Sequence, residues 1–110
     1  MLSYVLQILF ALVLLSPISA QTNAYKAILS KDGSEHAMQF VDACVTNIKR
    51  SNRKALDPIV AAIRYSENGK AGKQFGILHK RCPNTFRGQA GWCAATVQKN
   101  YDRWLRTKPK

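Results

Sequence analysis

The chain is poor in the residue types from which most active sites are built. Its 110 residues include six acidic residues, two histidines and three cysteines. His36 and His79 stand apart, and neither a C-x-x-C nor an H-x-x-x-H spacing occurs. Metal sites need such ligands in close groups, and paired-carboxylate catalysis needs two acids at one site. The sequence therefore predicts no metal, no cofactor, no small-molecule substrate and no enzymatic activity.

One cysteine has neighbours that suit a nucleophile. Cys82 follows His79 closely and comes directly after Lys80-Arg81, whose charges would lower the pKa of the thiol. In an oxidising compartment, a disulfide is the simpler expectation for this cysteine. Dibasic pairs of this kind also suggest cleavage of a prohormone, but a solvated basic face explains them better.

The beginning of the chain lacks lysine and arginine and is apolar. Residues 5–15 form a hydrophobic run that is followed by a proline and small residues, which is typical of a secretory signal peptide. A retained signal anchor is the alternative, but a membrane span needs about 20 apolar residues. We expect a signal peptide over residues 1–20, cleavage before Gln21, and a single secreted domain over residues 21–110.

Acidic residues are outnumbered by 17 lysines and arginines, which gives a formal net charge of +11. All of these charges lie within residues 21–110. Such a charge attracts anionic partners over long range, and this attraction weakens as salt is added. Outside a cell, the candidates are acidic proteins, anionic membranes and glycosaminoglycans. A basic surface that serves solubility alone is the alternative.

Apolar residues recur at helical spacing along most of the chain after residue 33. Asp57-Pro58 is expected to end one helix and begin the next, because proline disfavours helix before it and suits a first helical position. We expect an all-α fold, a small disulfide-stapled bundle of three to four helices, after a flexible lead-in over residues 21–30. The predicted helices span about 34–56, 58–66, 73–81 and 89–106, and the third is short enough for a strand to be an alternative.

The apolar stripes of these helices predict the core. Its expected members are Phe40, Val41, Cys44, Ile48, Ile59, Ile63, Val97, Tyr101, Trp104 and Leu105.

The opposite side of the last helix carries a tryptophan among basic residues. Such a face suits a ligand ring or a membrane interface. The candidate binding surface comprises Trp92, Lys99, Arg103, Arg106, Lys108 and Lys110. The alternative is that Trp92 packs under the loop at residues 83–88.

The cysteine count is odd, so at least one thiol is left over or pairs between chains. We favour a disulfide between Cys82 and Cys93, which would join two adjacent helix ends, with Cys44 as a buried thiol. A Cys44–Cys82 bridge is an alternative that closes a longer loop. A disulfide-linked dimer through the odd cysteine is another.

Several stretches resemble small secreted helical proteins of insect male accessory glands. The matching features are the signal peptide, the cysteine in the first mature helix (DACVTNIKR), a later Lys54-Ala55-Leu56, and the stretch GILHKRC. The chain departs from that plan in its cysteine count and lacks a C-terminal cysteine, so no disulfide pattern carries over. The resemblance implies a seminal-fluid protein that is transferred in mating and acts by binding, without catalytic residues.

These observations favour a secreted, strongly basic, non-enzymatic protein that acts by binding an extracellular protein or receptor. A cationic host-defence protein that acts on anionic membranes is one alternative. A binder of anionic polymers such as glycosaminoglycan is the other.

Overall fold

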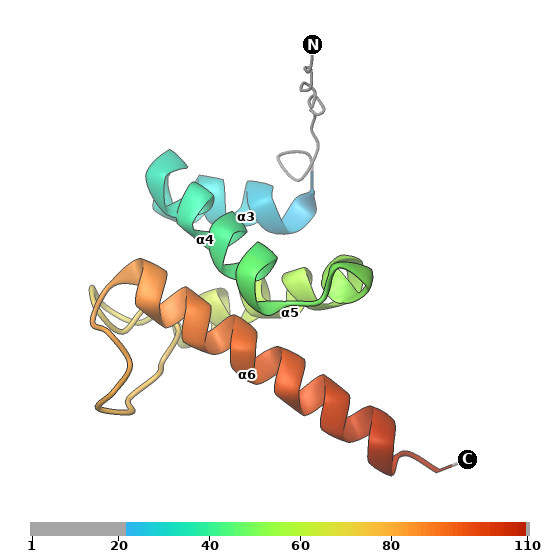
Figure 1. Cartoon of the computed structure of the whole chain (residues 1–110). Coiled ribbons are helices and arrows are strands. Elements are labelled where there is room, and N and C mark those ends of the chain that lie inside the picture. The colour runs from blue at the N-terminus through green and yellow to red at the C-terminus, as the bar shows by residue number, and fades with distance from the viewer. Residues whose placement is uncertain (1–21, 110) are drawn as a thin grey trace. The chain divides into compact units, whose positions relative to one another are not determined.

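The computed structural model describes residues 22–109, and within them the protein is all-helical without strands, which confirms the expected fold class. The predicted signal peptide over residues 1–20 lies outside the described residues. In chain order the elements are α3 (Asn23–Asp32), α4 (Ser34–Asn47), the 3₁₀ helix η2 (Arg50–Asn52), α5 (Arg53–Glu67) and α6 (Phe86–Thr107) (Figure 1).

Two compact units divide the chain, residues 1–37 and residues 38–110, and the boundary falls inside α4. The first contains α3 and the start of α4, and the second contains the remaining elements. The single domain that we expect over residues 21–110 stays a prediction.

The first described helix, α3, lies where we expected a flexible lead-in over residues 21–30, so that expectation is wrong. Thr22 caps the helix, because its hydroxyl accepts a hydrogen bond from the backbone N–H of Tyr25 at 3.1 Å. Gly33 ends it at a positive φ of 89°, and its N–H donates to the carbonyl of Leu29. Buried Ala24 and Ile28 lie one turn apart. One threonine and two spaced apolar residues are too weak a signal to predict a helix.

We predicted one continuous helix over 34–56, but the structure has two helices with a turn between them, so that prediction was wrong. α4 ends at Asn47, and Lys49 adopts an extended conformation before η2 begins. The backbone N–H of Lys49 donates to the side chain of Gln98 at 2.8 Å. Because that partner lies far along the chain, the local sequence does not reveal the turn.

α5 begins at Arg53 and continues through Pro58, where we expected a boundary. Proline removes one helical hydrogen bond, to the carbonyl four residues earlier, which here belongs to Lys54. Lys54 and Pro58 are both exposed, so water can satisfy that carbonyl. The helix ends at Asn68, which adopts the left-handed conformation at φ 45°.

Residues 68–85 form an irregular segment, and the helix predicted over 73–81 is absent from it. Gly72 and Gly76 have positive φ, which is incompatible with a helix. The segment is nevertheless anchored, because Phe75 and Cys82 are buried and Arg64 of α5 donates to the carbonyl of Gln74 at 3.3 Å.

The strongest anchor of this segment is the side chain of Gln89, which is fully buried in α6. Its Oε1 accepts from the backbone N–H groups of Phe75 at 3.2 Å and Ile77 at 3.1 Å. Its Nε2 donates to the carbonyl of Ile77 at 2.9 Å and to the sulfur of Cys82 at 3.4 Å. The side-chain amide of Gln89 thus supplies the backbone hydrogen bonds that a neighbouring β-strand would otherwise have supplied.

α6 begins slightly before the predicted residue 89, because Thr85 caps it by accepting from the N–H of Gly88 at 3.0 Å. Gln98, on the other side of α6, also has a buried side chain. Besides accepting from Lys49, it donates to the side chains of Asn52 and Asp102, each at 3.0 Å. α6 therefore holds the irregular segment through one glutamine and the α4–α5 turn through the other.

The predicted core is only partly buried. Phe40, Cys44 and Ile48 are buried, whereas Val41, Ile63, Val97 and Tyr101 are half-buried. Ile59, Trp104 and Leu105 are 46%, 53% and 41% exposed, so their assignment to the core was wrong. Residues that we did not assign to the core are buried in their place; they include Leu56, Val60, Phe75, Phe86, Ala90 and Ala94.

Replacing Gln89 by leucine should destabilise the second unit strongly. The change keeps the volume but leaves the buried N–H of Phe75 and the partly buried N–H of Ile77 without acceptors, which costs about 2–4 kcal/mol of unfolding free energy. Urea unfolding followed by circular dichroism measures the loss. Gln39→Leu, the same change at a half-buried position of α4, is the matched control. Equal stability of the two variants would contradict the role of Gln89.

The carboxylate of Asp57 should make stability depend on pH. Burial raises its pKa, although a hydrogen bond from Cys44 and the charge of Arg53 oppose the rise. The folded state therefore holds this proton more tightly than the unfolded state, and the resulting stabilisation is present in acid and lost as the pH rises through the raised pKa.

Asp57→Asn should consequently gain stability relative to the wild type at about pH 7, and the gain should shrink towards about pH 4. Urea unfolding of both proteins at the two pH values measures this difference. A gain that is larger in acid than at neutral pH would contradict the direction of the pKa shift.

Candidate functional site

An apolar surface lies exposed at the C-terminal end of α6. Its members are Ile59 of α5 and Tyr101, Trp104 and Leu105 of α6, which together we call the C-terminal face. α6 has 22 residues and α5 has 15, so at 1.5 Å per residue α6 is longer by about 10 Å. Figure 1 shows the last turns of α6 extending beyond α5. The apolar stripe of α6 therefore continues past the helix that covers it.

A groove runs along the inner edge of the C-terminal face, with a volume of about 350 Å³. Its lining residues are Leu56, Ile59, Ile63, Val97, Asn100 and Tyr101. Next to it, the rings of Tyr101 and Trp104 lie 5.9 Å apart at a tilt of 31°. In protein interfaces, the anchoring side chains of one partner insert into concave apolar surfaces of this kind, next to exposed aromatic rings.

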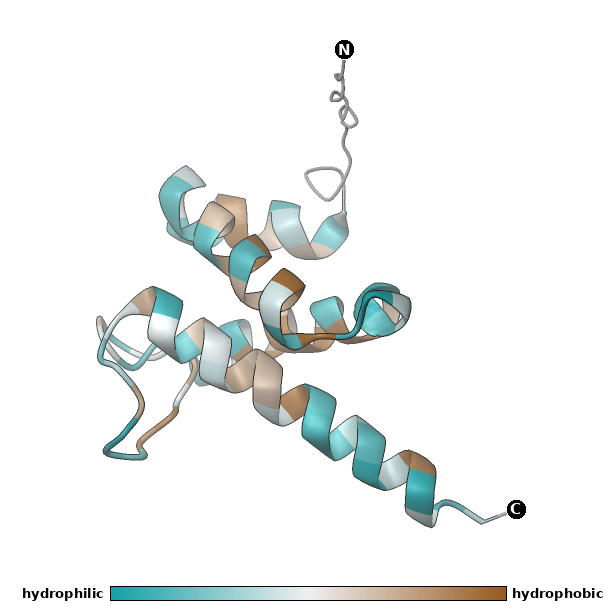
Figure 2. Cartoon of the chain, viewed as in Figure 1, coloured by the Kyte–Doolittle hydropathy of each residue, from teal (hydrophilic) through white to brown (hydrophobic). Residues whose placement is uncertain are grey.

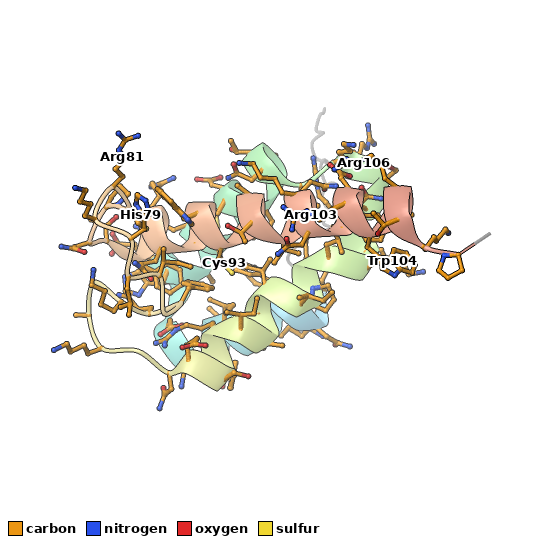
Figure 3. All side chains as sticks on the ribbon, turned by 90° about the horizontal axis from the view of Figure 1, so that it is seen from below. His79, Arg81, Cys93, Arg103, Trp104 and Arg106 are labelled. Carbon is orange, nitrogen blue, oxygen red and sulfur yellow. The ribbon has the colours of Figure 1, made fainter. Side chains whose placement is uncertain are left out.

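One cation lies on this face. The ammonium of Lys108 lies 5.0 Å from the centre of the Trp104 ring, which is a cation–π contact. Arg103 and Arg106 are exposed on the same turns, and Figure 3 shows Arg106 on the opposite side of α6 from Trp104. Figure 2 shows a hydrophobic band near the end of α6 between strongly hydrophilic turns. The end of α6 thus has an apolar side that carries Lys108 and a basic side opposite to it.

The structure divides the predicted binding surface into two places. Lys108 lies over Trp104 at the C-terminal face, and Arg103 and Arg106 are exposed on the same turns of α6, whereas Trp92 and Lys99 line a second groove nearer the start of α6. Lys110 lies outside the described residues.

Trp92 is half-buried and its ring lies against His79 of the irregular segment, which is not part of the loop at residues 83–88, so packing under that loop stays a prediction. The two rings are stacked, with centres 5.1 Å apart and a tilt of 29°. The second groove, which we call the Trp92 groove, has a volume of about 460 Å³. Its lining residues are Asn47, Pro83, Gly88, Gly91, Trp92, Ala95, Thr96 and Lys99.

The cysteines correct one expectation. Cys44, Cys82 and Cys93 are free and buried in this structure, so it contains neither the favoured Cys82–Cys93 bridge nor another disulfide among residues 22–109. Burial raises the pKa of Cys82, although Lys73 and the hydrogen bond from Gln89 oppose the rise. The sulfur of Cys82 accepts a hydrogen bond from Gln89, while Nδ1 of His79 accepts from the backbone N–H of Arg81 and its ring stacks on Trp92.

The other two thiols are also protected. Burial raises the pKa of Cys93 to about 12, and the Glu67 carboxylate adds to the rise. Burial is likewise the main reason that the pKa of Cys44 is raised far above its ordinary value, and Asp57 and Cys93 contribute. Both groups therefore stay protonated at physiological pH.

Between residues 22 and 109, no group of three or more histidines, cysteines and acids is placed to hold a metal ion. None of the helices in that part is both long and apolar enough to span a bilayer.

Comparison with family profiles, curated proteins and solved structures found no match to this chain. The resemblance to accessory-gland proteins therefore stays a prediction. Any proposal of function therefore rests on the residues of the two grooves alone.

Sequence reasoning missed most of the residues that line the two grooves, and Ile59 and Gly91 show why. Ile59 belongs to the C-terminal face, but its apolar character placed it in the predicted core. Gly91 lines the Trp92 groove, and the only signal for it in the sequence is a glycine inside a strongly helical stretch.

The buried thiols should react slowly in the native protein. In protein purified under reducing conditions, a thiol reagent should modify Cys44, Cys82 and Cys93 at least about tenfold more slowly before than after unfolding, because both access and thiolate are lacking. Mass spectrometry of samples quenched over time measures each rate. Fast native modification of Cys82 would contradict its burial.

Proposed function

We propose that this is a secreted, non-enzymatic, basic protein that acts by binding an extracellular protein through its C-terminal face. The single observation that carries the proposal is the exposure of Trp104 and Leu105, at 53% and 41%, beside a groove. Tryptophan, tyrosine and arginine dominate the energetics of protein interfaces. All three residue types meet at this end of α6.

The proposed partner is acidic. A net charge of +11 attracts anionic surfaces and repels a second copy of the same chain. That repulsion argues against self-association through the C-terminal face. The buried state of all three cysteines likewise argues against the disulfide-linked dimer that the odd count suggested.

Secretion is part of the proposal and rests on the apolar segment at residues 1–20. An oxidising compartment would favour a disulfide.

A second candidate function is binding to anionic membranes. Trp104 and Leu105 are exposed on a helix whose other side is basic, and Lys108 lies over the tryptophan ring. Helices of that kind lie in the bilayer interface. The protein partner is favoured because a groove accepts a protruding side chain, whereas a bilayer offers none.

A photo-reactive amino acid at position 104 tests the proposal. The labelled protein is irradiated in extracellular fluid from the tissue that receives it, and we expect one cross-linked adduct that excess wild type removes by competition. The Trp104→Ala, Leu105→Ala double variant should compete at least about tenfold less well, since it lacks two anchoring side chains. The same label at Met38, which is 57% exposed, is the matched control and should give no adduct.

Two outcomes would overturn the protein partner. Sedimentation with anionic vesicles, weakened by the double variant, in the absence of any adduct would establish the membrane candidate instead. Retention on heparin that depends on salt but not on Trp104 or Leu105 would indicate binding of anionic polymers.

A further inference from the structure

The Trp92 groove is a second concave site, separate from the C-terminal face. Its lining comes from one side of α6, together with Asn47 at the end of α4 and Pro83 of the irregular segment. All of these residues belong to the second unit. With a volume of about 460 Å³, the groove lies within the size range of small-molecule sites.

Two glycines line this groove for different reasons. A Cβ atom at Gly88 would lie 2.6 Å from the side chain of Pro83, so the fold itself requires glycine there. A Cβ atom at Gly91 would meet only the Asn47 amide, at an ordinary contact distance of 3.6 Å. Since alanine fits at Gly91 and stabilises a helix better than glycine does, packing does not explain the residue. Glycine at this position keeps the groove open.

The two ends of the groove differ in chemistry. At one end the Pro83 ring, the Trp92 indole and the bare backbone of Gly88 and Gly91 form a wall that is apolar except for the amide of Asn47, and the indole stacks on His79. At the other end stand the hydroxyl of Thr96 and the ammonium of Lys99.

These ends are well separated along α6. From Gly88 to Lys99 the helix rises roughly 16 Å at 1.5 Å per residue. A ligand that fills the groove is therefore elongated, with an apolar body and one anionic end.

We propose that the Trp92 groove binds an elongated carboxylate with an apolar body, of the fatty-acid class. The apolar body lies along Gly91 and Ala95 against Trp92, and the carboxylate is held by Lys99 and Thr96. The net positive charge of the chain favours the anion over a neutral or cationic chain of the same length. The protein is then a carrier or sensor of such a ligand in addition to its proposed role as a protein-binding factor.

Nuclear magnetic resonance with dodecanoate as the probe tests the proposal. The indole N–H signals of Trp92 and Trp104 are assigned with a Trp104→Phe variant, and the full secreted chain is titrated below the micelle concentration. We expect a saturable shift of the Trp92 signal while that of Trp104 stays in place. Dodecyltrimethylammonium, the matched cation, should bind at least about tenfold more weakly.

Variants separate the groove from non-specific binding. Gly91→Leu fills the groove and should abolish the shift of the Trp92 signal. Lys99→Gln should weaken dodecanoate binding about tenfold while leaving the tetraalkylammonium unaffected. Arg103→Gln removes the same charge one turn beyond the groove and should leave dodecanoate binding to the groove unchanged.

Dodecanoate binding that persists unchanged in Gly91→Leu, or that shifts Trp104 in place of Trp92, would overturn the proposal. So would a titration without saturation. If thermal unfolding shows that Gly91→Leu does not fold, the comparison of Lys99→Gln with Arg103→Gln decides, and equal effects of those two variants refute the site. Shifts confined to Trp104 would leave the proposed function of the C-terminal face standing.

Discussion

The arrangement of the second unit depends on the hydrogen bonds of one buried amide, the side chain of Gln89. Residues 68–85 contain neither helix nor strand, and their backbone groups have no regular ladder to join. Gln89 supplies acceptor and donor together to Phe75 and Ile77, and it also binds the sulfur of Cys82. This contact fixes the segment against α6, positions His79 on Trp92 and forms the wall of one groove. A leucine of the same volume would fill the space but would bind none of these groups.

The second consequence of this arrangement is an unequal burial of α6. Its first half carries Phe86, Ala90 and Ala94, which are buried, and it is surrounded by the irregular segment and α5. Its second half continues the same apolar stripe but extends beyond the end of α5, so the apolar residues there are exposed to solvent. Exposed ion pairs such as Lys49–Asp102 contribute little to stability, typically below about 1 kcal/mol. The charges of this end therefore contribute little to the stability of the fold.

Particular residues show why parts of this structure were predictable. The stripe that begins at Phe40 and Cys44 follows from spacing alone, and the structure buries both. The prediction of a helix over 73–81 was wrong. Phe75 is buried by a contact with Phe86 and by the side chain of Gln89, and not by a neighbour within a helix of its own. The prediction of a helix boundary at Asp57-Pro58 was wrong for a different reason. The carbonyl that loses its helical hydrogen bond to the proline belongs to an exposed residue, so water can bind it and the helix continues. Of the candidate site, the basic residues were predictable, and the exposure of Trp104 was not.

The amino-acid sequence by itself determined the helical character, the excess of positive charge and the scarcity of groups that carry out chemistry, because each of these follows from composition or from neighbours a few residues apart. The tertiary structure alone decided which apolar residues are covered. Covering a stripe requires a second element opposite it, and α5 is too short to cover the end of α6. It also decided the state of the cysteines and the depth of both grooves, since these depend on which distant segments meet across α6.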